Sequence, residues 1–131
     1  MRKTCVRLGA AGLALAGVTA ALPATAAAQP FTHGGGIHAD KGRNVIRATG
    51  WIKDRTSGRD FVAVQTFIER HTGKGWVTVV KGARRTGNNF ARSTIRFRTC
   101  TNGRLYRARV NYNWNNRPKY RFHSYTHNER C

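Results

Sequence analysis

Acidic residues are scarce in this chain: five Asp and Glu stand against 24 Lys and Arg in 131 residues. The formal charge is therefore +19 at neutral pH. An excess of this size attracts polyanions over long distances, and it indicates nucleic acid, acidic polysaccharide, teichoic acid or anionic lipid as partners rather than basic ones.

Long apolar runs are missing outside the N-terminus. Residues 1–7 carry three bases, residues 8–22 are apolar and uncharged, and small-x-small sites follow at residues 24–26 and 26–28. This order is typical of a secretory signal peptide, and the apolar run is short for a membrane span. We expect residues 1–28 to be a cleaved signal and the protein to be secreted to the extracellular space.

Cysteine is also rare, with three in the whole chain. Cys5 belongs to the predicted signal, which leaves Cys100 and Cys131 in an oxidising compartment. An even number of cysteines in a small secreted domain favours a disulfide, although two free thiols or an intermolecular bridge remain alternatives. On the chain-entropy model such a bridge would raise the free energy of unfolding by about 3–4 kcal/mol.

No segment has a helical period. Residues 29–43 are rich in glycine, and we expect a flexible lead-in there or a short edge strand. After it, strand-like runs alternate with turn signals at short spacing, at residues 45–54, 61–70, 76–82, 90–99, 104–114 and 120–127. The prediction for residues 44–131 is one all-β domain, an antiparallel sandwich or barrel of about six to seven strands.

Period-two alternation separates the arginines from the aromatic residues in the later runs. Ile95 and Phe97 face away from their neighbouring arginines, and Tyr106 to Trp114 alternate with Arg107, Arg109 and two asparagines. The aromatic side chains are therefore expected in the core and the arginines on the wet faces.

Three short motifs give the chain a resemblance. A strand with Val62-Ala63-Val64-Gln65, a strand led by Trp76, and the Tyr106 to Val110 strand are together similar to an Ig-like sandwich. The layout also resembles small secreted proteins of high-GC Gram-positive bacteria, mostly of unknown function, which pair a cysteine before the Tyr strand with one near the C-terminus. The resemblance implies an Ig-like fold with a Cys100–Cys131 bridge. It implies no catalytic residue, because fold does not carry function.

Binding of an anionic polymer is the function that the composition favours. Without residues 1–28 the chain keeps 21 bases and five acids, a formal charge of +16. Most of the bases are arginine, which suits bidentate contacts with phosphate or carboxylate. The expected binding residues are Arg107, Arg109, Arg121, His123, Tyr125, Arg92, Arg96 and Arg98, with Tyr125 as a stacking partner. If strands 90–99 and 104–114 lie in opposite sheets, their arginines point to opposite sides. The alternative explanation of the charge is a GC-rich genome, whose codons raise the arginine content, together with the charge that any solvent-exposed strand face needs.

Metal binding, hydrolysis and protease inhibition have weaker support in the sequence. His123 and His127 are too far apart on a strand to share one metal ion, and His33, His38 and Asp40 lie in the glycine-rich segment, so no metal or other cofactor is expected. A small secreted phosphodiester hydrolase, ribonuclease-like, would use His123 or His127 as acid or base, but no spacing singles out a pair. A protease inhibitor that presents the turn at residues 84–89 is a third alternative. The expected protein is therefore a non-catalytic binding protein.

Overall fold

A computed structural model describes residues 29–131, and the predicted signal peptide lies outside the described residues. The described chain is all-β, as predicted, with one short 3₁₀ turn. Its elements are β1 (Phe31–Asp40), β2 (Val45–Asp54), β3 (Phe61–Thr72), β4 (Gly75–Lys81), β5 (Arg85–Asn88), β6 (Phe90–Phe97), β7 (Leu105–Trp114), η1 (Pro118–Tyr120), β8 (Arg121–Tyr125) and β9 (Glu129–Arg130). The nine strands exceed the six or seven expected, because β5 and β9 are short strands with no clear sequence pattern.

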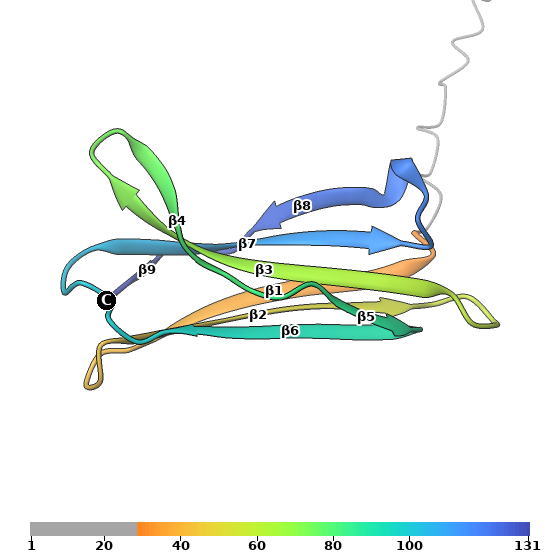
Figure 1. The fold of residues 1–131 in the computed structure, drawn as a ribbon, viewed down its shortest axis with the longest axis horizontal. Coiled ribbons are helices and arrows are strands. Elements are labelled where there is room, and N and C mark those ends of the chain that lie inside the picture. Colours follow the sequence, from red (N-terminus) through yellow and green to blue (C-terminus); the bar gives the residue numbers. More distant parts are fainter. Residues whose placement is uncertain (1–28) are drawn as a thin grey trace, which may run out of the picture.

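The strands form two antiparallel sheets that pack face to face (Figure 1). One sheet has the order β1-β2-β6; the other has the order β4-β3-β7-β8, with β5 paired to β3 and β9 paired to β7. This is the predicted sandwich, and the distribution of consecutive strands over the two sheets is Ig-like. The β3–β4 hairpin extends beyond the sandwich at one end (Figure 1).

The glycine-rich segment is part of the sandwich. Residues 31–40 form the edge strand β1, which pairs along its whole length with β2. Phe31 and Ile37 from this strand are buried in the core. The flexible lead-in expected for residues 29–43 is therefore wrong and the edge-strand alternative is right, so the domain begins near Phe31 rather than at residue 44. Three glycines hid the period-two pattern, because they add no side chains to either face.

The core follows the alternation that the sequence predicts. In β7, Tyr106, Ala108, Val110, Tyr112 and Trp114 are all buried, and the residues between them are only partly so. Complete burial of a large apolar side chain stabilises the fold by about 1.5–3 kcal/mol. The arginines of β7 are thereby directed to the outside of the sheet.

Small residues divide this core into two clusters. A Cβ at Gly50 would lie 2.3 Å from Cγ1 of Val110, so the two sheets approach each other very closely there. Beside it, the buried Thr66 hydroxyl donates a hydrogen bond to the Ser93 carbonyl at 3.3 Å. We call Gly50, Thr66 and Ser93 the waist. One cluster, with Phe31 and Trp114, lies on one side of the waist, and a second cluster, with Tyr106 and the disulfide, lies on the other.

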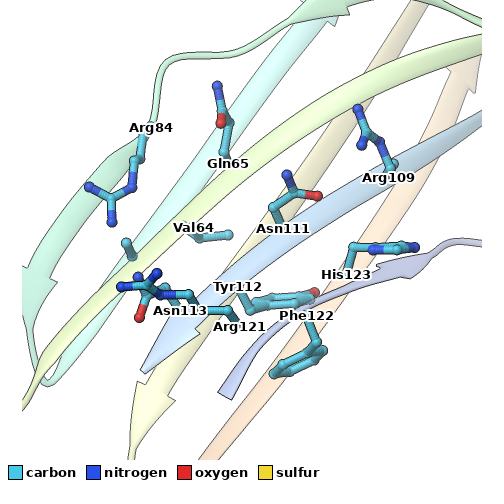
Figure 2. Close-up of a pocket in the computed structure, with 11 residues that line it drawn as sticks. Val64, Gln65, Arg84, Arg109, Asn111, Tyr112, Asn113, Arg121, Phe122 and His123 are labelled. Carbon is cyan, nitrogen blue, oxygen red and sulfur yellow. The ribbon is translucent and has the colours of Figure 1, made fainter. Parts of the chain in front are cut away.

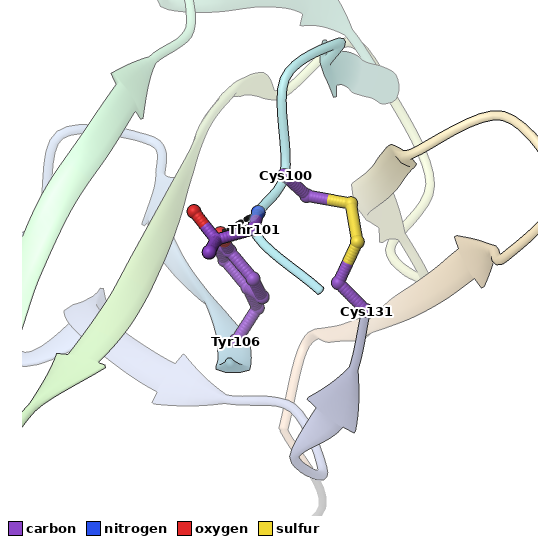
Figure 3. Close-up of a disulfide and its surroundings, with 4 residues drawn as sticks. All are labelled: Cys100, Thr101, Tyr106 and Cys131. Atoms are coloured by element: carbon purple, nitrogen blue, oxygen red, sulfur yellow. Dashed lines mark hydrogen bonds between the residues drawn. A yellow bond between two sulfur atoms is a disulfide. The ribbon is translucent and has the colours of Figure 1, made fainter. Parts of the chain in front are cut away.

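A disulfide and a tyrosine fix the connection between β6 and β7. Cys100 and Cys131 are bridged, as predicted, with their Cα atoms 6.1 Å apart. The Tyr106 hydroxyl accepts a hydrogen bond from the Thr101 amide at 2.8 Å (Figure 3). A tyrosine at this corner that bonds back to the preceding connection is a feature of Ig-like sandwiches. The chain passes from one sheet to the other at this corner.

Candidate anion-binding surfaces

The eight predicted binding residues divide between the two sheets. Arg92 and Arg96 lie on β6, and Arg98 follows directly after it, whereas the other five lie on β7 and β8. Because β6 and β7 belong to opposite sheets, these residues cannot form one surface. We call the outer side of the β1-β2-β6 sheet the three-stranded face and the outer side of the β4-β3-β7-β8 sheet the six-stranded face.

On the six-stranded face, two arginines are held by a buried carboxylate. Glu69 is 7% exposed and lies directly opposite Arg107 across β3 and β7. Nε of Arg107 donates a hydrogen bond to Glu69 Oε2 at 2.8 Å, and Nε of Arg109 lies 3.2 Å from Glu69 Oε1. Much of the positive charge of this arginine pair is therefore balanced inside the fold.

Aromatic rings hold the same two side chains in place. The Arg107 guanidinium carbon lies 4.2 Å from the ring centre of Trp76 and 3.8 Å from that of Tyr125. The guanidinium carbon of Arg109 lies 4.2 Å from the ring centre of Phe67. Such contacts are favourable by about 0.5–1 kcal/mol at exposed sites and by more when water is excluded. The Tyr125 ring thus stacks on an arginine of its own chain.

The three-stranded face carries a row of basic side chains across all three of its strands. His38 pairs in register with Arg47, and Arg47 pairs with Arg96. These three residues, with Arg43 and Arg98, line a depression of about 240 Å³. We call these five residues the basic row.

Few acidic side chains lie near the basic row. Asp40 lines the same depression, and its carboxylate lies 3.8 Å from Arg43 Nε in an exposed ion pair. Asp54 and Asp60 accept hydrogen bonds at the far end of β2, Glu69 lies on the other face, and Glu129 lies on β9. Within residues 29–131, no salt bridge forms to Arg47, Arg96 or Arg98.

The direct pairing of Arg47 with Arg96 has an energetic cost. Like charges directly opposite each other on neighbouring strands destabilise a sheet. Nothing in the packing requires the pair, because both side chains are exposed. Sequence reasoning missed Arg43, Arg47 and His38 as binding residues. The alternation in residues 45–54 carried a signal for Arg47, but its pairing with Arg96 depends on the register between distant strands.

An aromatic side chain lies further along the same face. Trp51 lies against the backbone of the edge strand, so that a Cβ at Gly34 would be 2.8 Å from Trp51 Cζ2. Its partner on the other side is Arg92. An indole beside an arginine extends the three-stranded face with a surface suited to stacking.

The histidines are distributed over separate environments. His127 Nε2 lies 3.3 Å from Glu129 Oε2, and the His123 ring lies 5.3 Å from that of Tyr125. His33 is partly buried on the edge strand β1, where its ring packs against Tyr112, and desolvation there lowers its pKa below the usual value. No group of three metal-ligating side chains occurs in the part of the chain that the structure describes.

The segment expected to form an inhibitory turn is structured differently. Arg85–Asn88 forms β5 and pairs with β3, so residues 84–89 do not make a protruding turn. The dibasic pair is therefore at a sheet edge, which is a correction to the geometry that the protease-inhibitor alternative needs.

No helix among residues 29–131 is both long and apolar enough to cross a membrane. No protein-family model and no curated protein matches this chain.

Proposed function

We propose that this protein is secreted and binds extended anionic polymers without catalysis, through the three-stranded face. The observation that carries the proposal is the basic row, in which Arg47 and Arg96 stand directly opposite each other without an acid between them. An anionic chain lying across this row would remove the repulsion between the two guanidinium groups.

The charge of the whole chain supports the same function. A formal charge of +16 without residues 1–28 gives a long-range attraction for phosphate, sulfate or carboxylate polymers. The exposed arginines provide planar donor pairs that match these groups. On the six-stranded face, Arg107 and Arg109 are bound to Glu69 and to aromatic rings, so these two arginines are less available to a polymer ligand.

The test is retention on heparin, DNA and lipoteichoic acid across a salt series. Affinity should fall linearly on a log–log plot, and removing one arginine that binds a phosphate should reduce the slope by about 1. The double variant Arg47→Gln/Arg96→Gln should therefore reduce the slope by about 2. The matched control Arg59→Gln/Lys74→Gln removes two exposed charges elsewhere and should change it less.

Two outcomes would overturn the proposal. One is an equal loss of affinity in the control variant, which would mean that charge alone is responsible. The other is no retention of the unaltered protein at about 0.15 M salt, where surface charges are screened beyond about 8 Å. DNA recovered after each run, and RNA incubated with the protein in parallel, are expected to be intact, whereas shortened RNA or DNA would support the hydrolase alternative instead.

A further inference from the structure

A second hollow lies on the six-stranded face, away from the basic row. It is a groove of about 340 Å³ across β3, β7 and β8 (Figure 2). Its outward-facing lining residues are Ala63, Gln65, Arg84, Arg109, Asn111, Asn113, Arg121 and His123. Ligand sites in proteins commonly begin at about 300 Å³, so this volume suits one small unit rather than a large molecule.

The register of the strands explains the shape of the groove. Gln65, Asn111 and His123 form one cross-strand row, and Ala63, Asn113 and Arg121 form the next. Ala63 contributes only a methyl group to the second row, so the floor is low there. Longer side chains stand around it, with Arg84 and Arg121 toward one end and Arg109 and His123 toward the other (Figure 2).

The groove is lined by basic and amide side chains. Three arginines and one histidine border the groove, and none of the residues that line it is acidic. Three amide side chains lie between them, at Gln65, Asn111 and Asn113. Cations flanking amides suit a ligand that has both a negative charge and hydroxyl groups.

Some of these side chains already have partners. Gln65 Nε2 donates to the Gly82 carbonyl at 2.8 Å, and Asn113 Oδ1 accepts from the Asn116 amide at 3.0 Å. Arg121 has a single long hydrogen bond to the Asn116 carbonyl, at 3.4 Å. Arg121 and Arg84 therefore retain most of their donors.

Two residues that line the groove each have a buried polar atom without a hydrogen bond. Within residues 29–131, Asn111 Oδ1 and Arg109 Nε are the buried side-chain atoms without a hydrogen-bond partner. Arg109 Nε has the nearby charge of Glu69 but not the alignment of a hydrogen bond, and Asn111 Oδ1 has no donor. Unpaired buried polar atoms are rare because they cost free energy. Arg109 Nε faces Glu69, which does not line the groove, so Asn111 Oδ1 is the atom of the groove that lacks a donor.

We propose that this groove binds a single anionic sugar unit. The carboxylate or phosphate of the sugar would lie between Arg84 and Arg121, and its hydroxyl groups would pair with the amide of Asn111. This goes beyond the proposed function, because the groove lies on the opposite face from the basic row and would bind its ligand without it.

The test is a titration followed by NMR, with glucuronate, glucose 1-phosphate, glucose and inorganic phosphate as probes. Glucuronate or glucose 1-phosphate should shift the signals of the Asn111 side-chain amide and Arg121 Nε. The one that binds more tightly identifies the charged group. Glucose and inorganic phosphate should each bind at least about 10-fold more weakly, because each lacks one of the two kinds of contact.

Variants separate this proposal from the previous one. Arg121→Gln and Asn111→Ala should each weaken binding of the charged sugar about 10-fold, whereas Arg96→Gln should leave it unchanged. A loss of polymer retention in Arg96→Gln with normal sugar binding would concern the basic row alone. Equal affinity for glucose, equal affinity for inorganic phosphate, or unchanged sugar binding in Arg121→Gln would overturn the groove proposal.

Discussion

The two outer faces of the sandwich both carry arginines but use them differently. Arg107 and Arg109 on the six-stranded face are only 20% and 28% exposed, because Glu69 and aromatic rings enclose them. On the three-stranded face, Arg47 stands opposite Arg96, and both are exposed. The residue across the strand thus decides whether an arginine stabilises the fold or is available to a ligand.

Removing the acid of the six-stranded face gives the largest expected loss of stability, and removing the acid of the three-stranded face gives a small one. Glu69→Gln should lower the free energy of unfolding by about 2 kcal/mol, because two partly buried guanidinium groups lose their counter-charge. Asp40→Asn should lower it by less than about 0.5 kcal/mol, because its pair with Arg43 is exposed. Urea unfolding of both variants measures the difference, and equal losses would contradict the comparison.

Removing an arginine from each face should change stability in opposite directions. Arg107→Thr should destabilise by about 1–2 kcal/mol, since it removes a charged hydrogen bond and two stacking interactions with aromatic rings. Arg96→Thr should stabilise by up to about 0.5 kcal/mol, since the repulsion from Arg47 is removed. Thermal unfolding at low salt provides the measurement. A loss of stability in Arg96→Thr would show that the basic row has a structural role.

Acidification tests His33, which is partly buried at the edge between the two sheets, and its effect on stability should be the smallest of the three. Burial lowers the pKa of His33, so the unfolded chain binds a proton at a higher pH than the folded chain. The stability that neutral His33 preserves is present above its unfolded pKa of about 6.5 and is lost as the pH falls through the folded value.

His33→Phe should therefore reduce the fall in melting temperature between about pH 7 and pH 5, whereas His71→Gln, on the projecting hairpin, should not. An unchanged slope in His33→Phe would mean that another group, and not His33, causes the acid sensitivity.

Local alternation is sufficient to predict much of this molecule. It places Tyr106 and Tyr112 inside and Arg96 and Arg109 outside, and the cysteine count predicts the bridge. The glycines of β1 carry no such pattern, so the sequence does not distinguish this edge strand from a flexible lead-in. The division of the arginines between two faces follows from the expected Ig-like strand order.

The partners of the arginines were beyond sequence reasoning. Glu69 is 38 residues from Arg107, and Arg47 meets Arg96 only through the register of β2 and β6. The groove depends on the small side chain of Ala63 standing between long ones, and no local pattern reports that. Such contacts arise from tertiary pairing, which determines what each arginine faces.

The waist at Gly50 gives this small domain two cores in series rather than one. Each cluster packs against its own part of both sheets. The waist residues are closely packed, so they leave no space through which a side chain of one cluster could shift toward the other. A change of volume beside Trp114 is therefore accommodated on that side, and a change beside Tyr106 on the other. Substitutions on opposite sides of the waist are expected to be additive in their effects on stability, as for separate domains.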